Sequence, residues 1–184
     1  MKEEFLNILR SIQRDGMEDL IKFIESTDFF KAPASTRFHG NFEGGLLAHS
    51  MKVYEILKEK LKHLPVQMNI SEETIKIVAL LHDICKVNYY KVDYRNAKND
   101  LGVWEKVPYY TVEDTIPYGH GEKSVMMITE YMKLTVEEKY AIRWHMGLSE
   151  PKELYGTLSV AFSKYPLALM LFEADLEATY LFDI

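Results

Sequence analysis

The chain has 184 residues, 47% of them hydrophobic, which is enough for one domain with its own core. Its net charge of −6 argues against electrostatic binding of duplex nucleic acid, which relies on many Lys and Arg contacts with phosphates. A locally positive site for a nucleotide or a short single strand is compatible with this charge. The single cysteine, Cys85, excludes an internal disulfide framework and suggests a reducing compartment.

We expect a cytoplasmic protein that does not bind membranes. Residues 1–16 are charged and amphipathic, without the long apolar segment and small-residue cleavage site of a secretory signal. The sequence also contains no apolar run near the ~20 residues needed to span a bilayer.

Helical periodicity dominates the chain, and there is no repeat, low-complexity tract or linker. The helices expected from this periodicity cover residues 3–14, 17–27, 46–64, 71–85, 121–133, 135–146, 151–164 and 166–182. Ser71 is a typical N-cap, Thr135 and Glu138 form a capping-box pattern, and Pro166 suits a first helical turn. Pro65 would end the third of these helices.

Residues 87–118 differ from the rest, because they are rich in Tyr, Asp and Asn. Two β-like runs, Val103–Lys106 and Tyr109–Glu113, flank Pro108 and predict a small hairpin at about 101–114. The sequence therefore predicts an all-α domain with a minor hairpin insert, in one unit from 1 to 184. Residues 1–30 would form N-terminal helices, and 31–184 the helical core.

Metal-ligand residue types recur on the expected apolar faces of separate helices. In chain order they are His49, His82, Asp83, His120, His145 and Asp175. His49, for example, shares a helical face with Leu46 and Val53, whereas His120 begins a helix. Burying a His or Asp without a partner costs several kcal/mol. A bound metal pair is the most economical partner that all of them could share.

Each of these residues alone has a simpler explanation, since a single inward histidine is more often hydrogen-bonded in the core and a single aspartate is usually solvated. The ordered set is harder to explain in this way. Mixed His and Asp ligands without thiolate suit Fe, Mn, Zn, Ni or Co rather than a structural zinc site of the Cys type. The adjacent His82 and Asp83 can be presented together, and the Asp83 carboxylate can bridge two ions.

At these residues the chain resembles the HD-domain metal-dependent phosphohydrolase superfamily, whose pattern is a His, a His-Asp doublet and a distal Asp. GGLLAHS at Gly44–Ser50 is similar to the GGLLEHT segment of HD domains attached to bacterial 3′-5′ exoribonucleases. LLHDICK, IRWHMG and ADLEA resemble the family's LLHDIGK, HHG and ADxLDA segments and lie at Leu80–Lys86, Ile142–Gly147 and Ala174–Ala178. The chain has Cys85 where the family has glycine and Met146 where it has a second histidine.

The resemblance implies an all-helical bundle that hydrolyses a phosphoester, of a nucleotide or a cyclic or short oligonucleotide, by a metal-bound hydroxide. It assigns one ion to four ligands, which are His49, His82, Asp83 and Asp175. Members with two additional histidines before the final Asp usually hold a second ion, so Asp83, His120 and His145 would bind it. We therefore expect two divalent transition-metal ions, with Fe, Mn, Zn, Ni and Co all open.

The expected catalytic residues are Asp83, which holds the metal, and Lys86, which would pair with a substrate phosphate or anchor Asp83. Lys123 and Arg143 are further candidates for phosphate contacts, although solvated helix surface explains them slightly better. His39 is a loop residue that could contact the substrate. The tyrosine-rich stretch 87–118 could cover the site and stack on a base, or could simply pack.

Two other functions stay open. A minority of HD proteins use the same ligands to hold two irons and cleave C–C or C–P bonds with O₂, which iron content with substrate-dependent oxygen uptake would reveal. A non-catalytic nucleotide-sensing module is the other. The intact ligand set weighs against that module, because a pure binding protein need not keep every ligand.

Overall fold

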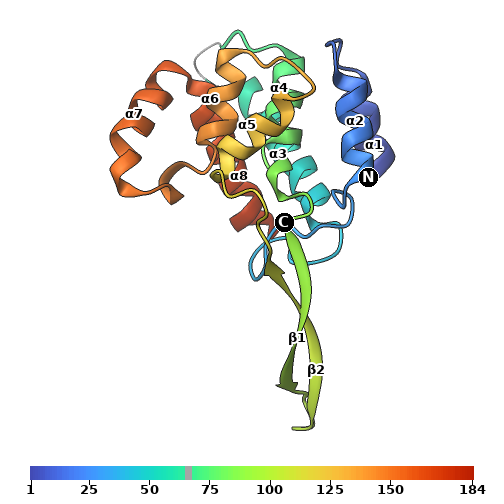
Figure 1. Cartoon of the computed structure of the whole chain (residues 1–184). Coiled ribbons are helices and arrows are strands. Elements are labelled where there is room, and N and C mark those ends of the chain that lie inside the picture. The colour runs from blue at the N-terminus through green and yellow to red at the C-terminus, as the bar shows by residue number, and fades with distance from the viewer. Residues whose placement is uncertain (65–67) are drawn as a thin grey trace.

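The computed structural model describes residues 1–64 and 68–184, which form a helical body with one long hairpin projecting from it (Figure 1). Its α-helices are α1 (Lys2–Arg10), α2 (Met17–Ser26), α3 (Gly45–Lys62), α4 (Glu72–Leu81), α5 (His120–Thr129), α6 (Val136–Trp144), α7 (Tyr155–Lys164) and α8 (Pro166–Phe182). The all-α prediction with a hairpin insert is confirmed. The predicted helix end at Pro65 lies outside the described residues.

The core lies between α3, α4, α6 and α8, and α8 packs against both α3 and α6. Leu57 of α3, Ile77 of α4, Ile142 of α6 and Leu171 of α8 are fully buried there. Each such side chain contributes about 1.5–3 kcal/mol by leaving water. The amphipathic α1 and α2 add their apolar faces to the same core. Among the described helices, none has both the length and the apolarity to cross a membrane.

A buried carboxylate, Glu138, ties the start of α6 to two other parts of the chain. Its side chain accepts from the backbone N–H of Thr135 while the Thr135 hydroxyl accepts from the backbone N–H of Glu138, so the predicted capping box is present. The Arg14 guanidinium donates to both Glu138 carboxylate oxygens, at 2.6 and 2.7 Å. The Thr74 hydroxyl in α4 donates a further bond of 2.8 Å, and Ser71 caps that helix as predicted.

The helix predicted to run to Cys85 ends earlier, at Leu81. His82 still has helical dihedrals, but Asp83 leaves the helix at φ −104° and ψ 15°, and a short 3₁₀ turn, η1 (Ile84–Lys86), follows. An uninterrupted α-helix would direct consecutive side chains about 100° apart. The break lets the side chains of His82 and Asp83 approach one another, with Nε2 and Oδ2 3.5 Å apart.

The hairpin is longer than predicted, and its strand limits differ. β1 (Tyr90–Lys98) pairs antiparallel with β2 (Trp104–Val112), so the two predicted runs lie almost entirely in β2 instead of facing each other. The chain turns at residues 99–103, where Gly102 has a φ of +74°. Pro108 stays inside β2, opposite Tyr94, because every strand of a two-stranded ribbon has an unpaired edge that tolerates a missing N–H.

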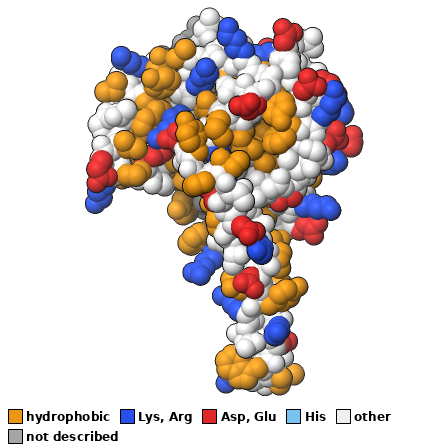
Figure 2. Space-filling model, viewed as in Figure 1, with side chains coloured by type: hydrophobic (Ala, Val, Ile, Leu, Met, Phe, Trp, Pro, Cys, Tyr) orange, Lys and Arg blue, Asp and Glu red, His pale blue; other side chains and the backbone are white. Residues whose placement is uncertain are grey.

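The ribbon extends well away from the helical body, and most of its side chains are exposed on both faces. Figure 2 shows hydrophobic side chains gathered at its far end, where Leu101 and Trp104 are exposed. Only the base of the ribbon, around Tyr90, packs against the hydrophobic core. The hairpin therefore contributes little to the core and stands beside the cluster of predicted ligands.

Candidate metal centre

All of the predicted metal ligands converge at one place in the helical body. They are His49 of α3, His82 and Asp83 after α4, His120 at the start of α5, His145 after α6, and Asp175 of α8. His49, His82, Asp83 and His145 are buried, whereas His120 and Asp175 are partly exposed. Segments as distant as α3 and α8 thus contribute to the same cluster.

The Asp83 carboxylate lies at the middle of the cluster, and its two oxygens face different histidines. Oδ1 lies 2.7 Å from Nε2 of His120 and 3.5 Å from Nε2 of His145. Oδ2 lies 3.5 Å from Nε2 of His82 and 3.8 Å from Nε2 of His49. The carboxylate therefore divides the cluster into two halves, as a bridging ligand would.

On the Oδ2 side of Asp83, His49 and His82 are joined by Asp175. Oδ1 of Asp175 lies 2.9 Å from Nε2 of His49. In the other half, the thiol of Cys85 lies 3.5 Å from Nδ1 of His120. Cys85 was not among the site residues predicted from the sequence. Its place two residues after Asp83, on the η1 turn, was the available signal for a contact with this half.

Backbone carbonyls fix the orientation of three imidazole rings. Nδ1 of His49 donates to the carbonyl of Ile184 at 2.8 Å. Nδ1 of His82 donates to that of Ala79 at 2.8 Å, and Nδ1 of His145 donates to that of Ile142 at 2.6 Å. Since a carbonyl only accepts, each Nδ1 carries the proton, and in the neutral ring Nε2 then holds a lone pair. This arrangement is typical of metal-binding histidines, whose second nitrogen is held by a carbonyl or carboxylate.

Among the described residues, no group donates a hydrogen bond to these Nε2 lone pairs. A bound cation would satisfy them. Nε2 of His49 and Nε2 of His82 lie 3.3 Å apart, although neither has a proton to donate. Nε2 of His145 is buried and has no hydrogen-bond partner in the described chain. Two nitrogens on one tetrahedral metal, each at about 2.0–2.1 Å from it, would be separated by about 3.4 Å. The cluster therefore fits a divalent transition metal.

The electrostatics keep His82 and the two carboxylates in their ligating forms. Burial lowers the pKa of His82 to about 3, so this ring is neutral at neutral pH. Burial alone would raise the pKa of Asp83, but Lys86 and the surrounding histidines bring that pKa well below its usual value. Burial alone would also raise the pKa of Asp175, but its contacts with the surrounding imidazoles, His49 first, bring that pKa below its usual value. Neutral imidazoles and ionised carboxylates are the forms that bind metal ions.

The cluster opens into a cavity of about 300 Å³, which we call the metal cavity. It reaches the surface between α8, the loop before α3 and the base of the ribbon. Lys86 and His39, two of the predicted substrate contacts, line this cavity. Nζ of Lys86 lies 2.7 Å from Oδ2 of Asp83. Nδ1 of His39 is buried without a hydrogen-bond partner among the described residues, and burial lowers the pKa of this histidine to about 4.

The other two predicted phosphate contacts are placed differently. Lys123 is buried instead of solvated, and its Nζ lies 2.7 Å from Oδ1 of Asp114 in a smaller neighbouring cavity of about 230 Å³. Arg143 pairs with Glu122 and Glu150 and is not among the residues that line the metal cavity. Both cations thus already have carboxylate partners, which their position in the sequence did not reveal.

A helical body with a buried His/Asp cluster that fits divalent ions defines a metal-binding α-helical domain. A comparison with protein-family models matches residues 46–178 to the HD domain, which is well over half of the chain and includes all of the predicted ligands. The chain therefore belongs to the HD-domain metal-dependent phosphohydrolase superfamily. Searches of curated proteins and of solved structures gave no significant match.

Proposed function

We propose that this protein hydrolyses a phosphoester bond of a nucleotide, or of a cyclic or short oligonucleotide, with two bound divalent ions. The observation that supports this most directly is the Asp83 carboxylate, whose two oxygens each face two histidines beneath an open cavity. Two-metal hydrolases need such a bridging ligand together with an open face for the substrate.

We propose one ion for each half of the cluster. One ion would be held by four groups, namely His49, His82, Asp83 and Asp175. The second would be held by Asp83, His120 and His145. Bound divalent ions at such a site lower the pKa of a coordinated water and neutralise charge on the phosphoryl oxygens. The His and Asp donors suit Fe, Mn, Zn, Ni or Co.

Lys86 has two tasks in this proposal. Its ammonium donates to Oδ2 of Asp83 and so holds the carboxylate in place. Burial alone would lower the pKa of Lys86, but Asp83 raises that pKa above its usual value, so the side chain keeps its charge. An ammonium has three donors, and the bond with Asp83 uses one of them. The others can bind a phosphate oxygen in the cavity that Lys86 lines.

His39 lies on the loop wall of the same cavity, with its ring centroid 5.1 Å from that of His49. Its unpartnered, neutral Nδ1 can accept a hydrogen bond from a substrate hydroxyl, or donate one in the other tautomer. His39 would therefore orient the substrate and take no part in holding the ions.

The test begins with protein purified without chelator. Its metal content is measured by mass spectrometry, and hydrolysis is screened anaerobically with Mn²⁺ against phosphomonoesters, cyclic nucleotides and dinucleotides. The proposal predicts phosphate or nucleotide release without oxygen. Asp83→Ala should lose both metal and turnover, whereas the exposed control Asp19→Ala should keep both. Full turnover by Asp83→Ala, or iron with substrate-dependent oxygen uptake and no hydrolysis, would contradict the proposal.

A further inference from the structure

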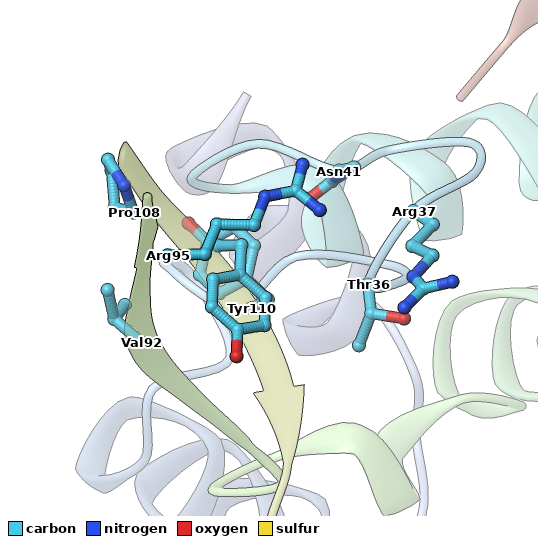
Figure 3. A pocket seen from close by; sticks show the side chains of 8 residues that line it. Thr36, Arg37, Asn41, Val92, Arg95, Pro108 and Tyr110 are labelled. Carbon is cyan, nitrogen blue, oxygen red and sulfur yellow. The ribbon is translucent and has the colours of Figure 1, made fainter. Parts of the chain in front are cut away.

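A second and larger cavity lies beside the metal cavity, between the loop before α3 and the projecting ribbon (Figure 3). Its volume is about 710 Å³, within the range of small-molecule binding sites. The lining residues are Thr36, Arg37 and Asn41 from the loop, and Val92, Arg95, Pro108, Tyr109 and Tyr110 from the ribbon. We call it the outer cavity. The hydrolysis proposed at the metal centre does not involve this outer cavity.

The walls of the two cavities are continuous. On the ribbon, the cross-strand pair of Tyr90 and Val112 lines the metal cavity. The next pair on the same face, Val92 and Tyr110, lines the outer cavity. Successive same-face pairs are about 7 Å apart along a strand. On the loop side, Thr36 lines both cavities. A ligand longer than one nucleotide could therefore occupy both.

The junction of the two walls is held in place by a hydrogen bond. The hydroxyl of Tyr90, at the base of β1, donates to the backbone carbonyl of Ala34 at 3.0 Å. Because Tyr90 and Ala34 both line the metal cavity, this bond fixes the base of the ribbon against the loop. The outer cavity is thus a built extension of the site, although its lining residues lie on an exposed ribbon and an exposed loop.

The outer cavity carries positive charge that the protein itself does not neutralise. Among the described arginines, Arg14 and Arg143 pair with carboxylates within 4.0 Å, whereas Arg37 and Arg95 do not. Arg37 belongs to the loop wall and Arg95 to the ribbon wall, and Figure 3 shows the Arg95 guanidinium reaching toward Asn41 of the loop. In a chain of net charge −6, two unpaired guanidinium groups on facing walls favour an anionic ligand. The planar donor fork of arginine fits a phosphate group in particular.

Aromatic rings line the outer cavity beside Arg95. The ring of Tyr110 lies below the side chain of Arg95 in Figure 3, on the ribbon wall, and is half-buried. The neighbouring Tyr109 has the Arg95 guanidinium 5.4 Å from its ring centroid, so its conformation is supported by a cation–π contact. Alternation of phosphate-binding cations with stacking rings is the usual means of binding a single strand.

From this geometry we propose that the outer cavity binds the second phosphate and base of a short single-stranded oligonucleotide whose scissile phosphate lies at the metal centre. Arg37 and Arg95 would hold the distal phosphate, and Tyr110 would stack on the base. This inference rests on the proposed phosphohydrolase function and narrows its substrate from single nucleotides to strands of at least two.

Binding can be measured separately from hydrolysis. The probe is fluorescein-labelled hexathymidylate with phosphorothioate linkages, which resist cleavage, and the readout is fluorescence anisotropy with protein as purified. Arg37→Ala and Arg95→Ala should each raise the dissociation constant about 5–10-fold, and each should reduce the slope of log K against log salt by about 0.7. Tyr110→Ala should weaken binding without changing that slope.

The matched control is Lys98→Ala, which removes an exposed cation from the same ribbon outside the outer cavity. It should bind the probe as the wild type does. The inference is overturned if the wild type does not bind the probe, if the Arg variants bind it as tightly as the wild type, or if Lys98→Ala weakens binding as much as they do.

Kinetics separate failure of this inference from failure of the proposed function. Hydrolysis of bis(p-nitrophenyl) phosphate, which has no second phosphate for the outer cavity, is compared with that of unmodified hexathymidylate. Arg95→Ala should reduce kcat/KM at least 5-fold more for the oligonucleotide than for the small diester. Equal reductions would overturn the outer subsite alone. Absence of hydrolysis of every phosphoester by the metal-loaded wild type would overturn the proposed function instead, whatever the binding result.

Discussion

Nε2 of His120 lies 2.7 Å from Oδ1 of Asp83, on the opposite carboxylate oxygen from the one that faces His49 and His82. One carboxylate thereby joins two separate sets of donors. If each set holds an ion, removing a histidine from one set should remove one ion and leave the other.

The first prediction concerns this stoichiometry. Wild-type protein should bind two metal ions per chain, and His120→Ala should bind one, because its other donors on the Oδ1 side are too few for tight binding. Metal analysis after dialysis against Mn²⁺ or Zn²⁺ gives the ratio. The control is His63→Ala, which changes an exposed histidine outside the cluster. A ratio of one in the wild type, or of two in His120→Ala, would contradict the prediction.

A second prediction addresses Lys86, which anchors Asp83 at 2.7 Å. Lys86→Ala should reduce metal affinity or turnover about 10–100-fold, the usual cost of losing a partner of a metal ligand. Lys86→Arg should recover part of the loss, since it restores the charge next to the carboxylate. Isothermal titration with Mn²⁺ and steady-state kinetics measure the two quantities. Wild-type values for both in Lys86→Ala would show that Asp83 needs no anchor.

The third prediction concerns stability away from the metal centre. Glu138 is fully buried and bonded to Arg14, Thr135 and Thr74. Glu138→Ala removes the capping-box bond, the Thr74 bond and the closer of the two carboxylates beside Arg14, which is partly exposed and keeps Glu73 at 3.7 Å, so the free energy of unfolding should fall by about 2–3 kcal/mol. The neighbouring Glu137→Ala should cost less than about 1 kcal/mol, because only its interaction with the helix dipole is lost. Urea denaturation of both variants tests the difference, and equal losses would contradict it.

The fourth prediction is the pH dependence of stability in metal-free protein. The pKa values of His82 and His39 are lowered to about 3 and about 4. The unfolded chain takes up protons at both histidines below pH ~6.5, which the folded chain does not, so stability falls as the pH decreases. The loss should approach about 1.4 kcal/mol per pH unit for each histidine between pH ~6 and ~4.5.

The lowered carboxyl pKa values of Asp83 and Asp175 act in the same direction but lower on the pH scale. Their stabilising effect is complete above the unfolded carboxyl pKa of about 3.9 and is lost only as the pH falls below it. Urea midpoints from pH 7 to 4.5 therefore report the histidines. His39→Gln should make this dependence shallower by about one proton. An unchanged slope in that variant would show that His39 is not kept neutral by the fold.

The sequence by itself determined the helices, their caps and the residues that form the His/Asp cluster, because these depend on local features. Apolar periodicity, the Ser71 cap and the Thr135–Glu138 capping box involve residues within one or two turns of each other, and all are present. The predicted ligands also lie together, since a buried His or Asp needs a partner wherever the chain places it.

Only the tertiary structure decided how these residues meet, because the deciding contacts join distant parts of the chain. The division of the histidines between the two Asp83 oxygens depends on the break after Leu81 and on the packing of α3, α5 and α6. The pairing of β1 with β2 placed Pro108 within a strand, where propensity alone suggested a boundary. The outer cavity exists because that ribbon stands against the loop of Arg37, a relationship between segments that no local pattern encodes.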